Sequence, residues 1–206
     1  MAEISSRGGA SQAVIARLAA ADAFGSLTLD RRAALWQALD QPRADEDAPL
    51  LTGVKDIDDS LPTLPELSPQ EQVFADYRSS GLSLRAHPLK FCREQLAALG
   101  VTPCKELAAW RHGRSVKVAG LVLMRQRPGT AKGITFVTLE DETGIANLII
   151  HKKTWARFEL VARRATALIV TGRLERKDTV IHVIARRIED LQAELEELRH
   201  RSRDFR

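Results

Sequence analysis

The chain has 206 residues, a net charge of +4, 44% hydrophobic residues and two cysteines. This length allows one or two domains, and the hydrophobic content is sufficient for an ordinary core. No apolar run approaches the length that spans a bilayer, and the N-terminus lacks a signal pattern, so we expect a cytoplasmic protein with no membrane partner. Cys92 and Cys104 fit neither a zinc motif nor a disulfide framework, which argues against a metal site.

The net charge is unevenly distributed along the chain. Residues 40–110 hold seven basic and twelve acidic residues, whereas residues 111–190 hold sixteen basic and eight acidic residues. Cations concentrated in one segment are typical of a domain with a polyanion partner. A basic surface that serves only solubility would give the same count, so charge alone leaves both interpretations open.

Residues 1–40 predict the end of a larger helical domain. Apolar residues at helical spacing follow Ser11, a suitable N-cap, and a second helix is expected at 29–39. Two such short helices bury little apolar surface by themselves, which indicates that another part of the domain is needed. Residues 41–69 are rich in proline and acidic residues, a composition that predicts an extended linker.

Residues 70–112 predict a helical connector. Its first helix begins after Ser68, because Pro69 suits the first helical position and Glu71 stands three residues after the cap. A second helical run is expected from His87.

Residues 113–190 follow the order strand, basic loop, strand, tight turn, strand, helix, strand, short turn, strand. Gly120 stands where a barrel strand must bend sharply. This order is typical of the OB fold, a five-stranded Greek-key barrel that commonly holds single-stranded nucleic acid. We therefore predict an α+β protein, with N-terminal helices, linker and connector before the OB-fold barrel and a C-terminal helix at 191–206. The expected strands are 116–123, 134–139, 145–150, 167–172 and 180–185, and a helix at 152–161 plugs one end of the barrel.

Candidate nucleic-acid-binding residues lie where this fold holds its ligand, on the second and third strands and the two flanking loops. Cations there would neutralise phosphates, with strong salt dependence. Phe136 would stack on a base if it faces outward, or belong to the core if it faces inward, and alternation along its strand leaves both open. The candidates are Arg125, Arg127 and Lys132 in the first loop, Phe136 on the second strand, and Arg173, Arg176 and Lys177 around the last turn.

The sequence contains no motif of a self-contained active site. A Walker-type loop, a nucleophile elbow and a zinc-protease helix are all absent. Asp56, Asp58 and Asp59 could suggest two-metal chemistry, but they lie in a proline-rich segment without a rigid scaffold. A solvated acidic linker is therefore favoured, and we predict no catalytic residue, metal or cofactor in this chain.

Four segments carry a family resemblance. They are LAAADAFGSL at 18–27, LDRRAALW at 29–36, GLSLRAHP at 81–88 and FVTLEDETG at 136–144. Their order and spacing resemble the C-terminal portion of a bacterial C-family DNA polymerase, of the error-prone alpha-subunit type that acts in DNA repair, DNA replication and translesion synthesis after DNA damage. The similarity extends from about Gln12 to Leu191.

The resemblance implies a helix-hairpin-helix region that grips duplex product and a barrel near the single-stranded template. The family's polymerase carboxylates and the Mg²⁺ they hold lie upstream in the palm, so we expect this chain to be a fragment or a truncated product that does not polymerise DNA alone. The nearest candidate for the family's clamp-binding peptide is Ala48-Pro49-Leu50-Leu51. It lacks the preceding glutamine and the terminal aromatic residue, so direct binding to a sliding clamp is not expected.

The alternative function is a protein-interaction module. Aromatic residues make up only 5% of the chain, whereas stand-alone single-strand binders use several stacking platforms. The barrel and the apolar stripe of Leu191, Leu195 and Leu198 would then dock other translesion or replication proteins, and DNA contact would be incidental. The stripe could instead pack against the barrel.

Overall fold

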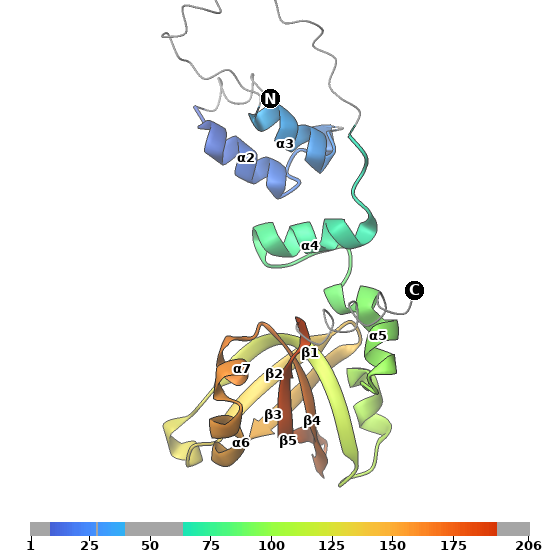
Figure 1. The fold of residues 1–206 in the computed structure, drawn as a ribbon, viewed down its shortest axis with the longest axis vertical. Helices are drawn as coiled ribbons and strands as arrows, with labels where there is room; N and C mark the ends of the chain where they lie inside the picture. The colour runs from blue at the N-terminus through green and yellow to red at the C-terminus, as the bar shows by residue number, and fades with distance from the viewer. Residues whose placement is uncertain (1–8, 28, 40–63, 193–206) are drawn as a thin grey trace, which may run out of the picture. The chain divides into compact units, whose positions relative to one another are not determined.

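The computed structural model describes residues 9–27, 29–39 and 64–192, which fall into two units (Figure 1). The first unit extends to Ala86 and the second begins at His87, so the division lies inside the predicted 70–112 connector. No helix in the described part of the chain is long and apolar enough to cross a membrane.

The described residues of the first unit form three α-helices and one short 3-10 helix. They are α2 (Gln12–Ala20), η1 (Gly25–Leu27), α3 (Arg31–Leu39) and α4 (Pro69–Ser80). Ser11 caps α2 as predicted, because its side chain accepts a hydrogen bond from the backbone N–H of Val14. The core between α2 and α3 is small and rich in alanine, which lets the two helices approach closely. Its buried members are Ile15, Ala19, Phe24, Ala34 and Ala38.

The predicted start of α4 is confirmed. The Ser68 hydroxyl accepts from the backbone N–H of Glu71, and the Glu71 carboxylate accepts from the backbone N–H of Ser68. This reciprocal capping box satisfies two N–H groups that a helix start otherwise leaves unpaired. The helix ends at Gly81, whose φ of 79° suits glycine.

A buried carboxylate links the helices of the first unit. Asp76 on α4 forms ion pairs with Arg31 of α3 and with Arg85, the latter at 2.9 Å, and it accepts from the Ser83 hydroxyl at 2.6 Å. Arg85 also pairs with Asp22 at 2.6 Å. Burial acts to raise the pKa of Asp76, but these hydrogen bonds outweigh it and hold the pKa below its usual range. Charge pairing therefore supplements a core that is small.

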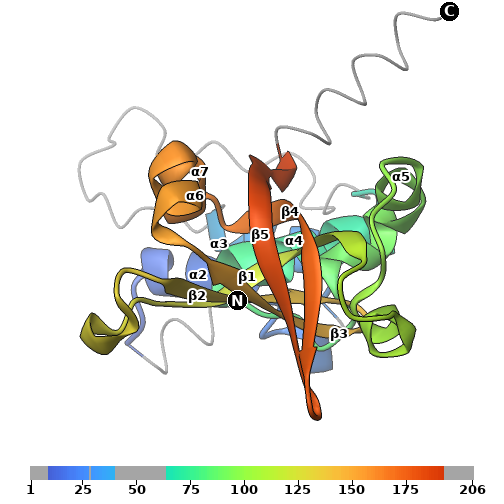
Figure 2. The same ribbon diagram turned by 90° about the horizontal axis from the view of Figure 1, so that it is seen from below.

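The second unit contains the predicted five-stranded OB-fold barrel. Its strands close in the order β1-β2-β3-β5-β4; β3 and β5 are parallel, and the other neighbours are antiparallel. Figure 2 shows the same barrel from below, with the long β4–β5 hairpin projecting from it. The strands are β1 (Ser115–Gln126), β2 (Thr135–Asp141), β3 (Gly144–Ile150), β4 (Ala167–Lys177) and β5 (Val180–Asp190).

All five strands are longer than the sequence predicted, and the difference is largest for β1, β4 and β5. Strand β4 continues past Gly172 because the missing side chain lets β5 cross closely: a Cβ there would lie 2.5 Å from the carbonyl oxygen of Ile184. The last turn is therefore confined to Asp178 and Thr179, and Asp178 has a φ of 54°. Strand β1 includes Arg125, so the prediction that Arg125 lies in the first loop was wrong.

Gly120 bends β1 as predicted. It lies where β1 stops pairing with β4 and begins to pair with β2. A Cβ at this position would stand 2.7 Å from the carbonyl oxygen of Glu140 and 2.8 Å from the Cβ of Leu139. The close crossing of two strands, and not a turn, is what requires glycine here.

The helix predicted at 152–161 divides in two at Phe158. It forms α6 (Lys152–Arg157) and α7 (Glu159–Arg164), and Phe158 between them has non-helical dihedrals. Trp155 and Phe158 are partly buried against the barrel core, so the helices cover one end of the barrel as expected. The core itself is formed by inward-facing strand residues, among them Val118, Val137, Leu139, Leu148, Ile150, Leu168, Val170, Leu174 and Val183.

Part of the predicted connector belongs to the barrel unit. It forms η2 (Pro88–Cys92), α5 (Arg93–Ala98) and η3 (Cys104–Ala109). A second apolar cluster joins this part of the connector to β1 and β4. Leu191 of the predicted apolar stripe is buried in this cluster, whereas Leu195 and Leu198 lie outside the described residues. The cluster comprises Leu89, Cys92, Leu96, Val101, Ala119, Ile169 and Leu191.

Asp141 fixes the turn between β2 and β3 and attaches η3 to it. Its carboxylate accepts hydrogen bonds from the backbone N–H groups of Thr143 at 2.7 Å, Gly144 at 3.0 Å and Cys104 at 2.9 Å. Arg93 pairs with it at 3.1 Å. Burial acts to raise the pKa of Asp141, but the hydrogen bonds from Thr143 and Cys104 outweigh it, so the pKa lies below its usual range.

Arg125 fastens β1 to the helices at the barrel end. Its Nε donates to the carbonyl oxygen of Ala162 at 2.8 Å, and its Nη2 donates to the carbonyl oxygen of Ala165. These carbonyls stand at the C-terminal end of α7, where helices leave acceptors unpaired and favour a cation. Burial lowers the pKa of this guanidinium.

We expect Asp141→Asn to lower the free energy of unfolding by about 2 kcal/mol at pH 7, because the amide cannot accept as many hydrogen bonds and leaves Arg93 partly unpaired. A lowered folded-state pKa stabilises the protein fully above the unfolded pKa, about 3.9, and this contribution is lost as the pH falls through the folded value. Urea unfolding from pH 7 to pH 3 should show the difference between the two proteins narrowing below about pH 4. A difference in unfolding free energy that stays constant from pH 7 to pH 3 would contradict the lowered pKa of Asp141.

Arg125→Gln should lower the free energy of unfolding by about 1–3 kcal/mol, because two carbonyls at the end of α7 lose a charged donor. Arg127→Gln is the matched control, since Arg127 is exposed and has no hydrogen bond in the described part of the chain. The two variants are compared by thermal unfolding, with circular dichroism as the signal. Equal melting temperatures for the two variants would argue against a structural role for Arg125.

Candidate nucleic-acid interface

The outward surface of β2 and β3 carries an apolar row. Phe136 is in register with Gln126 on β1 and with Ile149 on β3, and Ile149 is in register with Ile184 on β5. Residues in register point to the same side of a sheet. Thr135, Val137 and Leu139 alternate with Phe136 and are buried, so Phe136 faces outward, is half-buried and does not belong to the core.

A polar row lies beside the apolar one. Thr138, Asn147 and His182 are in register on β2, β3 and β5. The Thr138 hydroxyl donates to Oδ1 of Asn147 at 3.2 Å, which leaves the Asn147 amide N–H groups without a partner in the described part of the chain. Nδ1 of His182 is buried and has no partner there either. An aromatic ring next to unpaired polar groups suits a nucleobase, which offers a face for stacking and an edge for hydrogen bonds.

The β1–β2 loop gathers cations at one side of this face. Arg127 and Lys132 are exposed in the loop, and Lys132 has a φ of 49°. A Cβ placed on Gly133 would lie 3.4 Å from Cδ of Lys152 and 3.6 Å from Nη2 of Arg127, so the first residue of α6 joins the loop. Sequence reasoning did not select Lys152, because the residue was counted only as part of a helix.

The β4–β5 hairpin carries the other predicted cations. Arg173 is exposed and in register with Ile184, which continues the row of Phe136 and Ile149. Lys177 is exposed at the end of β4. The structure brings the hairpin and the β1–β2 loop to opposite sides of the outward face of β2 and β3, since the loop adjoins Phe136 and the hairpin begins beyond His182.

Arg176 has a different environment from its neighbours. Its guanidinium donates to the carbonyl oxygens of Ala108 and Trp110, the latter at 3.2 Å, and its backbone N–H donates to Nδ1 of His112 at 3.1 Å. It therefore ties the hairpin to the end of η3. Of the six predicted cations, Arg125 and Arg176 hold carbonyl groups of the chain itself. The other four, Arg127, Lys132, Arg173 and Lys177, have exposed side chains with no hydrogen bond or ion pair in the described part of the chain.

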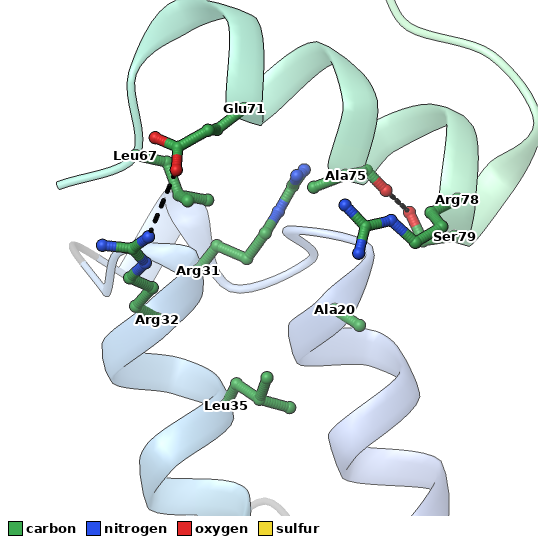
Figure 3. Close-up of a pocket in the computed structure, with 9 residues that line it drawn as sticks. All are labelled: Ala20, Arg31, Arg32, Leu35, Leu67, Glu71, Ala75, Arg78 and Ser79. Carbon is green, nitrogen blue, oxygen red and sulfur yellow. Dashed lines mark hydrogen bonds and ion pairs between the residues drawn. The ribbon is translucent and has the colours of Figure 1, made fainter. Parts of the chain in front are cut away.

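The helical unit contains a separate hollow of about 470 Å³ (Figure 3). Arg31, Arg32 and Arg78 line it, together with Glu71, and Leu35 and Leu67 contribute apolar surface. Arg31 is buried, and its Nε has no hydrogen-bond partner in the described part of the chain. Figure 3 shows the side chain of Arg78 reaching from α4 into the space between the helices. Arg31 is paired with Asp76 and Arg32 with Glu71, so Arg78 is the cation of the hollow that has no ion pair in the described residues.

No group of three histidine, cysteine or acidic side chains in the described residues is arranged to hold a metal ion. Cys92 and Cys104 are buried thiols. Burial, with the nearby Asp141 carboxylate, raises the pKa of the Cys104 thiol far above its usual range, so this thiol stays protonated and unreactive.

Comparisons with known proteins bear on the barrel and on the chain as a whole. The family described as OB-fold nucleic acid binding domain matches residues 116–191. The error-prone DNA polymerase of Rhodopirellula baltica is 50% identical over 99% of this chain, and that of Caulobacter vibrioides is 48% identical over 94%. The chain spans 18% of the length of each of these relatives.

Among solved structures, asparaginyl-tRNA synthetase from Pyrococcus horikoshii is 22% identical over 44% of this chain and 23% of its own, with a TM-score of 0.39. The resemblance seen in the four sequence segments is thus confirmed by relatives that match along nearly the whole chain. The chain contains an OB-fold nucleic acid binding domain and is similar, over almost all of its length, to one segment of the error-prone DNA polymerases.

Proposed function

We propose that this chain is the DNA-guiding segment of an error-prone DNA polymerase that copies damaged templates, and that its barrel holds single-stranded template DNA. The observation that carries the proposal is the outward row of Phe136 and Ile149, which lies between two groups of exposed cations. An aromatic residue stacks on bases, while flanking cations neutralise phosphates.

The spacing between Phe136 and the flanking cations suits a single DNA strand that crosses the face. From Phe136 on β2 to Arg173 on β4 there are three strand-to-strand steps, through Ile149 and Ile184. At about 4.8 Å a step this is about 14 Å around the barrel. The loop cations Arg127 and Lys132 lie on the other side. A DNA strand that crosses β2 and β3 therefore meets positive charge where it enters the face and where it leaves.

The barrel is suited to work inside a larger enzyme. It offers one outward aromatic residue on the face, Phe136, whereas tight single-strand binders use several. Because the relatives are more than five times as long as this chain, we assign the polymerase carboxylates and their Mg²⁺ to the remainder of the enzyme. This chain alone then binds DNA and incorporates no nucleotide.

The helical unit would hold the duplex product. Arg78 lines the hollow of this unit without an ion pair in the described residues, and the family resemblance implies that this region grips duplex DNA. Phosphate contacts of this kind fix position without reading sequence.

A second candidate function is docking of another translesion or replication protein. Ile145 and Val180 support it, since 55% and 48% of their respective surfaces are exposed and both stand at the same end of β3 and β5. A partner that covered them would bury apolar surface that water otherwise contacts. DNA contact would then be incidental to the barrel.

Fluorescence anisotropy with a labelled oligo-dT of about 12 nucleotides distinguishes the two functions. The double variant Arg127→Gln with Lys132→Gln should reduce the slope of log K against log salt by about 1.4, which is two phosphate contacts at about 0.7 each. Phe136→Ala should weaken binding about tenfold with the slope unchanged, because stacking involves no counterion release.

Lys90→Gln with Lys105→Gln is the matched control, because both lysines are exposed and lie on η2 and η3, which contribute no side chain to the proposed contacts. These changes should leave affinity and slope unchanged. If the unmodified chain does not bind the oligonucleotide at low salt, DNA guidance is excluded and the docking function is favoured.

A further inference from the structure

Helices α6 and α7 present a concentration of cations, of which Lys152 alone adjoins the β1–β2 loop of the proposed barrel face in the described residues. Five basic residues and one acidic residue, Glu159, occupy 152–164. All five basic side chains are exposed, and none has an ion pair or side-chain hydrogen bond in the described part of the chain. They are Lys152, Lys153, Arg157, Arg163 and Arg164.

Two of these cations are unfavourable for the helix that carries them. Lys152 and Lys153 stand in the first turn of α6, where the helix dipole disfavours positive charge by about 0.3–1 kcal/mol each. His151 provides no side-chain cap to compensate. Residues that destabilise their own helix indicate a requirement other than folding at these positions.

The cations continue the positive surface of the β1–β2 loop. The side chains of Lys152 and Arg127 both approach Gly133, as the distances above show. Figure 1 shows α6 close to this loop, with α7 following it along the same side of the barrel. A polyanion that leaves the barrel face at the loop therefore meets α6 next.

The outer face of α7 combines an apolar side chain with its charged ones. Leu160, Arg163 and Arg164 line an open hollow of about 560 Å³, together with Glu159. Leu160 is 65% exposed, and the two arginines follow it by three and four residues, so all three lie on one face of the helix. Leucine offers apolar contact to a sugar or base, while guanidinium groups pair with phosphate.

These helices are held rigidly enough to act as a binding surface. Arg125 fastens the end of α7 to β1, and Trp155 and Phe158 are packed against the barrel core. Sites on fixed elements lose less entropy when a ligand binds.

We propose that α6 and α7 form a second nucleic-acid contact surface, which holds the phosphates of the strand after it leaves the barrel face at the β1–β2 loop. This inference rests on the proposed function, since it requires the strand to lie on the barrel. It assigns nucleic acid and not an acidic protein to the surface, because the cations are continuous with those of the nucleic-acid face.

Two labelled oligo-dT probes of about 6 and about 18 nucleotides test the inference, the shorter one sufficient only for the barrel face. Arg163→Gln with Arg164→Gln should weaken binding of the longer probe about tenfold at low salt and reduce its salt slope by about 1.4. Binding of the shorter probe should not change. Lys90→Gln with Lys105→Gln serves again as the charge-matched control, and circular dichroism verifies that each variant is folded.

Each other outcome has a distinct meaning. If the variant binds the longer probe as well as the unmodified chain does, the inference is overturned and the proposed function stands. Equal weakening of both probes also overturns it, since the helices would then belong to the barrel face itself. If the unmodified chain binds neither probe, the proposed function fails and this inference fails with it.

Discussion

The buried carboxylate of Asp141 is the constraint on which the geometry of the barrel face depends. It fixes the turn that joins β2 to β3, the two strands at the centre of the face, and it accepts from the backbone of Cys104 at the start of η3. The end of η3 in turn holds Arg176, which sets the position of the β4–β5 hairpin. One desolvated carboxylate thus orders elements on three sides of the face, because a buried charge requires every hydrogen bond it can obtain.

A second set of hydrogen bonds, made by Arg125, positions the elements at the other end of the barrel. Arg125 holds the carbonyl groups of Ala162 and Ala165, and so fixes the helices that carry Lys152 and Arg163. The basic residues of the barrel therefore divide into two kinds. Partly buried or carbonyl-bound guanidinium groups position the framework, whereas exposed cations are available to phosphates.

The sequence was sufficient for the order of strands, the bend at Gly120 and the capped start of α4, because each follows from local rules of steric fit and hydrogen bonding. It could not separate the two kinds of cation. Arg125 and Arg176 meet carbonyls 37 to 68 residues away, and nothing in the spacing of a basic loop reveals such contacts. Phe136 was ambiguous because its neighbour Thr135 is polar yet buried, so the alternation of polarity along β2 does not follow the alternation of exposure.

The balance of contacts on the face bears on how a polymerase would use it. Cations contact phosphates whatever base they carry, and their contribution is spread over many weak, exchangeable pairs. Stacking, which holds a particular nucleotide in place, depends on Phe136 alone on the strands of this face. Under the proposed function, a DNA strand bound in this way would stay near the enzyme yet could advance by one nucleotide at little cost, because each phosphate that left a cation would be replaced by the next. Under the same proposal, a template that contains damaged bases would need this tolerance, since the contacts that persist would be those to its backbone.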